Sequence, residues 1–532
     1  MLCRKQNRMP CVFELLFMAG HLLSTVASAA LPDRIPEGCG QPPKNIPCYE
    51  RPRMIVPPEE GFLAGPLHQP NMRIPQLSVD GHDFFVLPAT PATTTWGYFD
   101  SSVRPALTIK PGDTVAVETL PGGGGNVAPG ITIEALEYIN AAVQGRGPHT
   151  MTGPIAVAGA MPPSKDSKGD VLAIHINKIR MRSYATNNSG DFAGLFSEYG
   201  QGGPYQSPVF PHFVSHFVDS YYLDNDKMET VFETHPRIVV PLKPFPGVLA
   251  GARSIEEERL AYTGNNPADP KALMGWCVEN PPAPLGGPGC NTKQPGNFGG
   301  NLDLPAMTVG STTYLPVWQK GGLIWTGDSH AAQGNGEIDL DALETAFPEL
   351  NITVDVIHRD GHPEFGDQPI VETPTSWVTL GYAVSLNEAL NKLMAETTRF
   401  IAAKYGLSKE AAEARMFDVW DCPISEVVDE VLGTYCMIPK NAKPPRARDL
   451  PKKDTSSHWV SYASDPADLM GAMKKAAYAS VQQMAREIGI SEAKAYKLAT
   501  FVQDCRIERP KSLNPEAYGV SCMVPKSIYR RH

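Results

Sequence analysis

A short stretch, Gly327–Glu337 with the sequence G-D-S-H-A-A-Q-G-N-G-E, carries the residue types that could do chemistry. Asp328 and His330 lie two residues apart, so their side chains would point to the same face of an extended segment. Two glycines then let the backbone turn tightly and bring Glu337 back toward the pair. Two carboxylates and an imidazole can hold a divalent metal and leave a base beside it. The stretch therefore predicts the floor of an active site.

The same stretch also has a purely structural interpretation. An Asp-x-His followed by glycines occurs in turns whose side chains cap the backbone, and such turns are commoner than ligand clusters. Isolated histidines elsewhere, such as His175 in the alternating segment Val171–Ile179, are expected on strand faces. Spacing alone therefore leaves a metal site and a capped turn as alternatives.

Composition limits the class of protein that could position such a site. The 532 residues are enough for two or three structural units. The 51 prolines and 47 glycines favour many turns and short strands over a helical bundle. The net charge of −10, without a cluster of basic and aromatic residues, argues against a nucleic-acid partner.

The first 29 residues have the pattern of an export signal. A basic head precedes the mostly apolar segment Val12–Val26, and Ala27–Ala29 matches a small-residue cleavage site. We therefore expect a secreted or periplasmic protein. No other segment is long and apolar enough to span a bilayer, so we expect no membrane span after cleavage.

The cysteines are consistent with export. Eight follow the signal, and an even number in an exported chain favours disulfides. A zinc site made of cysteines is the weaker alternative, because no C-x-x-C occurs. Other pairings remain open, but the spacing favours four local pairs: Cys39–Cys48, Cys277–Cys290, Cys422–Cys436 and Cys505–Cys522.

Strand patterns precede the stretch Gly327–Glu337, which is called the opening stretch from here on, and helical patterns follow it. Two alternating segments, one on each side of the tight turn Pro111–Asp113, predict two strands. The run Gly122–Gly125 lacks a phosphate-loop frame and predicts a flexible loop. The acidic segment after Glu337 is predicted to be helical.

The last third repeats itself. Helices are predicted over Leu386–Tyr405 and Leu469–Ile488, and each leads through a Gly-x-Ser into a second helix that ends at Asp-Cys. The sequence C-M-I-P-K returns later as C-M-V-P-K. Such ordered landmarks indicate a duplicated unit of strand, two helices and strand.

The expected fold is mainly β, with a sandwich- or barrel-like core and an α+β C-terminal part. The predicted divisions are a signal peptide at 1–29, an irregular arm at 30–80, a β-rich core at 81–375 with an insertion at about 264–290, an α+β unit at 376–440, a linker at 441–455 and a second copy of the unit at 456–532.

Over roughly residues 84–440, the motifs occur in an order that resembles the acetamidase/formamidase family of amide hydrolases. They are P-G-D-T-V-A-V-E-T at 111–119, G-P-H-T-M-T-G-P at 147–154, G-G-N-L-D at 299–303, T-Y-L-P-V-W at 313–318, the opening stretch, E-T-P-T at 372–375, and then V-V-D and C-M-I-P-K in the first C-terminal unit.

The resemblance implies hydrolysis of a small linear amide, such as formamide or acetamide, to a carboxylate and ammonia. It also implies a divalent metal, for which we expect zinc, with calcium as the alternative. We further expect a homo-oligomer. Two alternatives stay open: a catalytically silent exported binding protein on the same fold, and an enzyme that opens a cyclic amide.

The resemblance and the spacing together give seven candidate site residues. They are Asp328 and His330 as metal ligands, Glu337 as general base or acid or as a third ligand, Asn301 and Asp303 to orient substrate or complete the metal shell, and His149 and Glu118 to bind substrate.

Two departures from the family pattern matter. Asn335 stands where the family has Asp, which lowers the local negative charge. We therefore expect Asn335 to alter metal affinity or substrate choice. The insertion before Gly299 and the second C-terminal unit are expected to reshape the entrance.

Overall fold

A computed structural model describes the chain from residue 76 to residue 530 with several gaps. The described residues are 76–79, 81–101, 103–122, 127–136, 147–189, 194–196, 217–254, 277–278, 289–429, 431–441, 449–511 and 518–530. The predicted signal peptide, most of the arm and the Cys39–Cys48 pair lie outside these residues. No helix in the described part is long and apolar enough to cross a bilayer.

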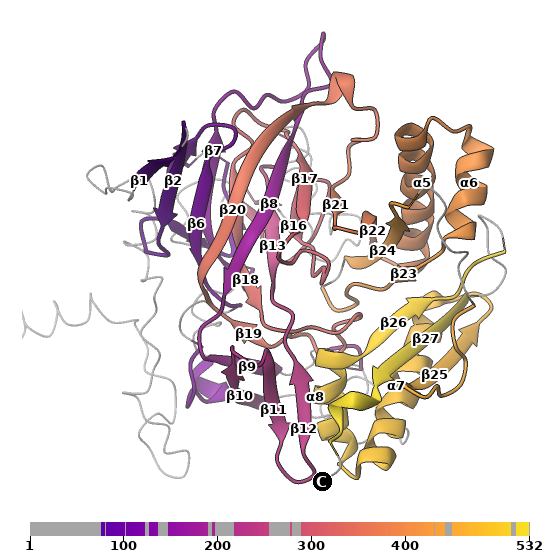
Figure 1. The fold of residues 1–532 in the computed structure, drawn as a ribbon. Helices are drawn as coiled ribbons and strands as arrows, with labels where there is room; N and C mark the ends of the chain where they lie inside the picture. Colours follow the sequence, from indigo (N-terminus) through magenta and orange to yellow (C-terminus); the bar gives the residue numbers. More distant parts are fainter. Residues whose placement is uncertain are drawn as a thin grey trace, which may run out of the picture.

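Two large sheets form the β body (Figure 1). The first has nine strands in the order β1-β2-β6-β20-β8-β17-β21-β22-β24. Their bounds are β1 Gln76–Val79, β2 His82–Leu87, β6 Thr114–Thr119, β8 Asp170–Arg180, β17 Thr312–Pro316, β20 Phe347–His358, β21 Ile370–Glu372, β22 Ser376–Ala383 and β24 Leu432–Pro439.

The second sheet has eleven strands, and β18 lies near its centre. Its main path runs β12-β11-β10-β9-β19-β18-β13-β16, and β7 pairs with β18, β3 and β5. The bounds are β3 Thr94–Trp96, β5 Leu107–Ile109, β7 Thr150–Val157, β9 Tyr184–Ser189, β10 Phe217–Asp224, β11 Glu229–Glu233, β12 Ile238–Pro241, β13 Phe245–Ala250, β16 Gly299–Asn301, β18 Ile324–His330 and β19 Glu344–Thr345.

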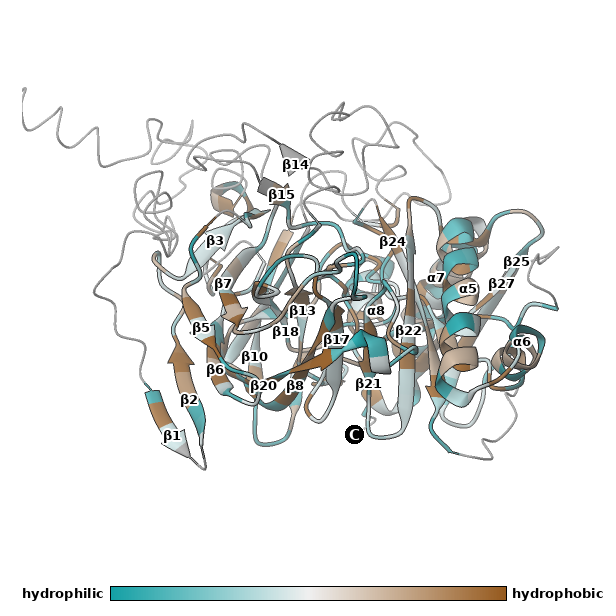
Figure 2. Cartoon of the chain, turned by 90° about the horizontal axis from the view of Figure 1, so that it is seen from above, coloured by the Kyte–Doolittle hydropathy of each residue, from teal (hydrophilic) through white to brown (hydrophobic). Residues whose placement is uncertain are grey.

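Alternating apolar residues bury the facing sides of these sheets. In β6, Val115 and Val117 are fully buried, and they belong to the same core cluster as Ile155 of β7 and Ile324 of β18. Figure 2 shows apolar residues along the strands of both sheets and mixed polar and apolar residues along α5 (Leu386–Tyr405). The predicted mainly β fold is confirmed.

One local prediction is confirmed and another is wrong. The two strands predicted around Pro111–Asp113 are present, but they do not pair with each other: β5 pairs with β7, while β6 pairs with β2 and β20. The turn therefore passes the chain from one sheet to the other. The acidic segment after Glu337 is irregular and then enters β19 and β20, so the predicted helix is wrong. Its carboxylates at 339 and 344 are buried, whereas a surface helix would expose its acidic face to water.

The duplicated helix pairs are present. Helices α5 and α7 (Leu469–Ile488) end at Gly406 and Gly489, and both glycines adopt the left-handed conformation that closes a helix. The second helices are α6 (Lys409–Asp418) and α8 (Glu492–Val502). The predicted disulfides Cys422–Cys436 and Cys505–Cys522 are present, and β14 (Cys277–Val278) places Cys277 opposite Cys290 of β15 (Gly289–Asn291).

The two units attach to the β body in different ways. Strands β22 and β24 of the first unit extend the nine-stranded sheet. The second unit contributes β25 (His458–Asp465), β26 (Asp504–Ile507) and β27 (Tyr518–Pro525) to a separate four-stranded sheet. Its edge strand β23 (Cys422–Pro423) comes from the first unit, so this sheet joins the units (Figure 1).

Candidate active site

Strand β18 presents Asp328 and His330 to the same buried space, as predicted. The Nε2 atom of His330 lies 3.2 Å from Oδ2 of Asp328, and both side chains are buried. Asp328 has a positive φ of 51°, an uncommon conformation for a residue with a side chain. Such strain clusters at functional sites, where the surrounding structure holds it in place.

His330 is held by acceptors on both ring nitrogens. Its Nδ1 lies 2.7 Å from Oε1 of Gln333, and its Nε2 lies 3.0 Å from Oε1 of Glu344. Strand pairing sets the second contact, because β19 places Glu344 directly opposite His330. Burial opposes protonation of the ring, but Glu344 and Asp328 together raise the pKa of His330 well above its ordinary value.

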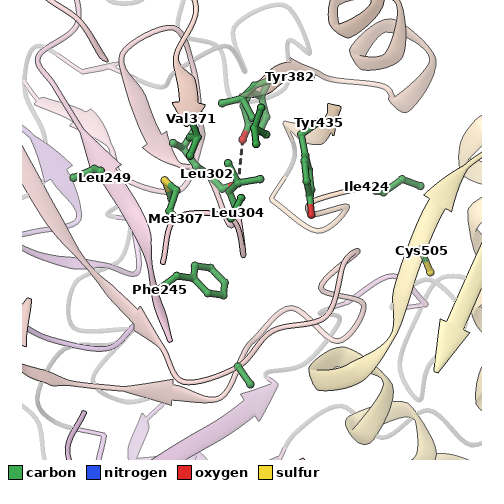
Figure 3. Packing of buried hydrophobic residues seen from close by; sticks show 14 of the residues in the cluster. Phe245, Leu249, Leu302, Leu304, Met307, Val371, Tyr382, Ile424, Tyr435 and Cys505 are labelled. Carbon is green, nitrogen blue, oxygen red and sulfur yellow. Dashed lines mark hydrogen bonds between the residues drawn. The ribbon is translucent and has the colours of Figure 1, made fainter. Parts of the chain in front are cut away.

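Asp303 lies beside this pair because β16 and β18 both pair with β13. The backbone N–H of Asp303 donates to the carbonyl of Gly247 in β13, and its Oδ1 lies 3.6 Å from Nδ1 of His330. The carboxylate is fully buried, and neither oxygen has a hydrogen-bond partner among the described residues. The hydroxyl of Tyr382 donates to the carbonyl of Leu302 at 3.0 Å and anchors the segment (Figure 3).

A glycine makes this close approach possible. A Cβ atom at Gly247 would lie 2.5 Å from Oδ2 of Asp328 and 2.9 Å from Oδ1 of Asp303. Real Cβ atoms essentially never approach that closely. The absence of a side chain at 247 therefore leaves the space between the two carboxylates open.

Asp303, Asp328 and His330 together form the centre of the site. His149 directly precedes β7 and lies beside this centre. Its Nε2 lies 3.6 Å from Oδ2 of Asp328, and its Nδ1 lies 3.2 Å from the carbonyl oxygen of Thr292. Burial opposes ionisation of Asp328, yet His149 and His330 lower the pKa of that carboxyl to about 2. Asp328 is therefore ionised at neutral pH.

Glu337 belongs to a neighbouring group of carboxylates. Ligand atoms of Asp303, Glu337 and Asp429 lie within 4.8 Å of one another, as do those of Asp303, Asp328 and His330. Burial and the other carboxylates raise the pKa of Glu337 well above its ordinary value. Asn301 donates to Oδ2 of Asp429 at 2.6 Å and so belongs to the second group.

Two predicted residues have other contacts. The carboxylate of Glu118 accepts from the backbone N–H of Ala89 at 3.0 Å, and no described contact joins it to the centre. Asn335 donates to Asp504 at 2.7 Å and accepts from the hydroxyl of Tyr435 at 2.8 Å. Its amide therefore ties the loop to both C-terminal units, so the expectation that Asn335 tunes the charge of the centre has no support in these contacts.

Sequence reasoning missed four residues that the fold brings to the centre: Gln333, Glu344, Asp429 and Gly247. For two of these residues the sequence contained a signal that could have identified them. Gln333 lies inside the opening stretch, and Asp429 is the acidic residue of the V-V-D motif. Glu344 carried no local signal, and its partner Gly122, which donates to Oε2 at 2.9 Å, begins the glycine run that we predicted to be only a flexible loop.

Fold and site together define a mainly β protein with a buried centre of carboxylates and imidazoles. The model of the Acetamidase/Formamidase family matches residues 91–506. The chain belongs to this family.

The matches to two curated relatives span about half of this chain. It is 28% identical over 285 residues to a formamidase from Methylophilus methylotrophus, and 26% identical over 307 residues to an acetamidase from Mycolicibacterium smegmatis. These matches cover 50% and 52% of this chain, and 66% and 68% of the relatives' own lengths.

Solved structures share the fold at low identity. An acetamidase from Bacillus halodurans matches with a TM-score of 0.50 and 24% identity, over 66% of this chain and 97% of that one. A gamma lactamase from Delftia acidovorans matches with a TM-score of 0.52 and 17% identity, over 82% of this chain and 90% of that one.

Proposed function

We propose that the chain hydrolyses the carbon–nitrogen bond of small linear amides and releases a carboxylate and ammonia. The observation that carries the proposal is the buried centre of Asp303, Asp328 and His330, in which the Asp303 carboxylate has no hydrogen-bond partner among the described residues. Membership of the family and the names of the two curated relatives support the substrate class.

The residues at this centre fit a divalent metal. The fully buried carboxylate of Asp303 lacks hydrogen bonds, which costs free energy, and a cation within reach would offset that cost. One imidazole and two carboxylates form a donor set that suits zinc. When bound, the metal would polarise the amide carbonyl and lower the pKa of a water molecule.

Three residues of the chain would orient a metal ligand, supply a negative charge and contact the substrate. Gln333 accepts from Nδ1 of His330, so Nε2 is the nitrogen that would give up its proton and take the ligand role when a metal binds. Because Asp328 is ionised at neutral pH, it can serve as an anionic ligand. His149 lies 3.6 Å from Asp328 and would contact an amide that binds beside that residue.

Glu337 has one of two roles under this proposal. Its raised pKa suits a carboxyl that holds a proton and donates it to the departing amine. Its place beside Asp303 also suits an additional metal ligand. Replacement by glutamine removes both the transferable proton and the carboxylate, so it would reduce turnover in either role.

Metal content and ammonia release test the proposal. The wild type is expected to hold metal and release ammonia from formamide or acetamide. His330→Ala and Glu337→Gln should lower kcat/KM by ~10²-fold or more. The matched control is His175→Ala, because His175 lies on β8 and its ring contacts Thr312. Unchanged turnover in both site variants would place the active site elsewhere.

Opening of a cyclic amide is the second candidate. It breaks the same type of bond, and the Delftia acidovorans protein named a gamma lactamase has a similar fold. A γ-lactam in the assay panel, followed by the appearance of the amino acid, tests it. A protein that holds no metal and cleaves none of the amides would instead favour a binding role.

We also propose export and assembly into a homo-oligomer. The small-residue pattern at 27–29 and the disulfides Cys422–Cys436 and Cys505–Cys522 support export. Sequencing of the mature N-terminus tests the cleavage near Ala29, and cell fractionation tests the compartment. Light scattering of the purified protein tests the oligomeric state.

A further inference from the structure

The two C-terminal units repeat the same internal pairing. In the first unit β22 pairs with β24, in the second unit β25 pairs with β27, and all four strands are eight residues long. The offset that relates Leu386, where α5 begins, to Leu469, where α7 begins, also relates Cys422 to Cys505. Each residue of β23 therefore has a counterpart in β26.

These counterpart strands meet in a contact that is the same from both sides (Figure 1). The opposed residues are Cys422 with Ile507, Pro423 with Arg506, and Ile424 with Cys505, where the backbone N–H of Ile424 donates to the carbonyl of Cys505 at 3.0 Å. An exchange of each residue for its counterpart returns the same three contacts. The contact is therefore isologous, the type that two identical subunits make about a two-fold axis. The axis passes through the pair Pro423–Arg506, whose members are counterparts of each other.

The first turns of the corresponding helices also meet. The side chain of Asn387, in the first turn of α5, donates to the carbonyl of Ala467 and accepts from the backbone N–H of Leu469, both at 3.0 Å. Leu469 is the first residue of α7. Corresponding ends meet in a two-fold pair, whereas repeats stacked in one direction bring unlike ends together. The helices therefore follow the same arrangement as the strands.

A strand edge of this kind needs a partner. An uncovered edge exposes backbone N–H and C=O groups that can pair with another chain. Here β23 is covered by β26, and β26 is covered by β23 on the side away from β27. Because the contact is self-complementary, the group that fits either edge is another copy of the same unit.

We propose that the second C-terminal unit is a built-in partner of the first, and occupies the β23 edge at which the same unit of a second copy of this chain would otherwise pair. The self-complementary face is thus closed within one chain, and association between chains uses other surfaces. This pairing does not depend on whether the chain cleaves amides.

One charged residue at the axis differs between the units. Arg506 donates from Nε to Asp504 at 2.8 Å and also forms an ion pair with Asp421. Asp421 and Asp504 are counterparts, so this single cation serves one carboxylate from each unit. The first unit has Pro423 at the corresponding position. An arginine at 423 would therefore meet the same two carboxylates from the other side of the axis.

A transfer of the arginine across the axis tests the self-complementarity. Arg506→Ala leaves Asp421 and Asp504 without this cation and should lower the thermal midpoint of unfolding by ~2–4 °C. Addition of Pro423→Arg should recover about half of that loss or more, because the new side chain reaches the same carboxylates. Hydrogen exchange of the Ile424 amide should become faster in the single variant and slow again in the double variant.

The matched control is Arg506→Ala with Pro423→Ala, which removes the same proline but supplies no cation. It should recover nothing. A Pro423→Arg substitution that restores no more than Pro423→Ala would overturn the proposal. An Arg506→Ala chain with an unchanged midpoint and unchanged exchange at Ile424 would also overturn it.

A chemical cross-link tests whether the pair closes within one chain. Asn387→Cys with Ala467→Cys places one thiol on each unit, at a contact that lies apart from the disulfides of both units. The full chain is treated with a short bis-maleimide and separated by reducing, denaturing electrophoresis. The cross-linked product should have the mass of one chain. A product of two chain masses that is absent from both single-cysteine variants would place another copy at this edge and overturn the proposal.

Discussion

At the residue scale, the orientation of His330 depends on Gln333. The side-chain oxygen of Gln333 can only accept, so the 2.7 Å contact places a proton on Nδ1 of the ring. Nε2 is then the atom that faces Asp328 and Glu344. A ligand whose orientation is fixed in advance loses less entropy when a metal binds.

Gln333→Ala removes this acceptor. Under the proposed zinc site it should lower zinc affinity by ~10–100-fold, the usual effect of losing a hydrogen bond behind a metal ligand. Competition with a chromophoric chelator measures the change. Gln319→Ala is the control, because Gln319 donates to the backbone of Arg253. Equal affinity in Gln333→Ala and wild type would show that the contact does not orient the ring.

Asn335 is the residue whose interpretation changed most. Its amide donates to Asp504, which also accepts from Arg506 at 2.8 Å. Asn335→Asp would place two carboxylates at hydrogen-bond distance and remove the donor. We expect a loss of stability of about 1–3 kcal/mol, the cost of leaving a partly buried acceptor unpaired.

Chemical denaturation of Asn335→Asp measures this loss, and the exchanged pair Asn335→Asp with Asp504→Asn provides the control. The exchange restores one amide and one carboxylate, so stability should return most of the way to the wild-type value. If the double variant is as unstable as the sum of the single variants, the two residues are not coupled.

At the element scale, β13 holds the centre together. It pairs with β16, which leads to Asp303, and with β18, which carries Asp328 and His330. Val248 of β13 lies opposite Asn301 on one side and Gly327 on the other. Candidate ligands distant in sequence therefore converge because one strand is their shared neighbour.

Gly247→Ala tests this arrangement. The added methyl group would lie 2.5 Å from Oδ2 of Asp328, so the carboxylates or the strand must move. We expect zinc content to fall to less than a tenth of the wild-type value, ~10-fold or more in affinity. Gly361→Ala is the control, because nothing lies within 4 Å of its added Cβ. Normal zinc content in Gly247→Ala would show that the space is not needed.

Both C-terminal units support the loop that leads to Glu337. The backbone N–H of Gly334 donates to the carbonyl of Thr500 in the second unit, and that of Gly336 donates to the carbonyl of Ser425 in the first unit. The second unit also contacts the β10–β12 region through Lys497 and Asp219 at 2.6 Å. The duplication thus contributes to the position of Glu337, and not only to the outer surface.

At the scale of the whole molecule, buried carboxyls should make stability depend on pH. Burial raises the pKa of Asp339 from 3.8 to about 7. Below about pH 4 the carboxyl is protonated in both states, and its contribution to stability is fully present. As pH rises toward 7 the unfolded chain ionises first, so the folded state loses up to ~4 kcal/mol.

Asp339→Asn should remove this part of the pH dependence. The difference in thermal midpoint between the variant and the wild type should grow in the variant's favour from pH 4 to pH 7. The exposed residue Asp360, changed to Asn, is the control: hydrogen bonds from Lys168 and Ser167 lower the pKa of its carboxyl, so its variant should gain nothing as the pH rises. A difference that stays constant over this range would contradict the raised pKa of Asp339.

Several features could be predicted from the sequence because their causes are local. The helices Leu386–Tyr405 and Leu469–Ile488 have their own caps and terminal glycines, so neighbouring residues set their bounds. Asp328 and His330 lie two residues apart in β18, the spacing that places side chains on one face of a strand, although the positive φ of Asp328 departs from regular strand geometry. The repeat likewise appears directly as recurring motifs.

Only the tertiary structure decided which distant residues complete the centre. Glu344 faces His330 because β19 pairs with β18. Asp303 lies beside His330 because β16 and β18 both pair with β13. The same long-range pairing separated the two strands around Pro111–Asp113 into different sheets. Sheet pairing depends on which apolar faces can be buried together across the whole chain, and no short segment contains that information.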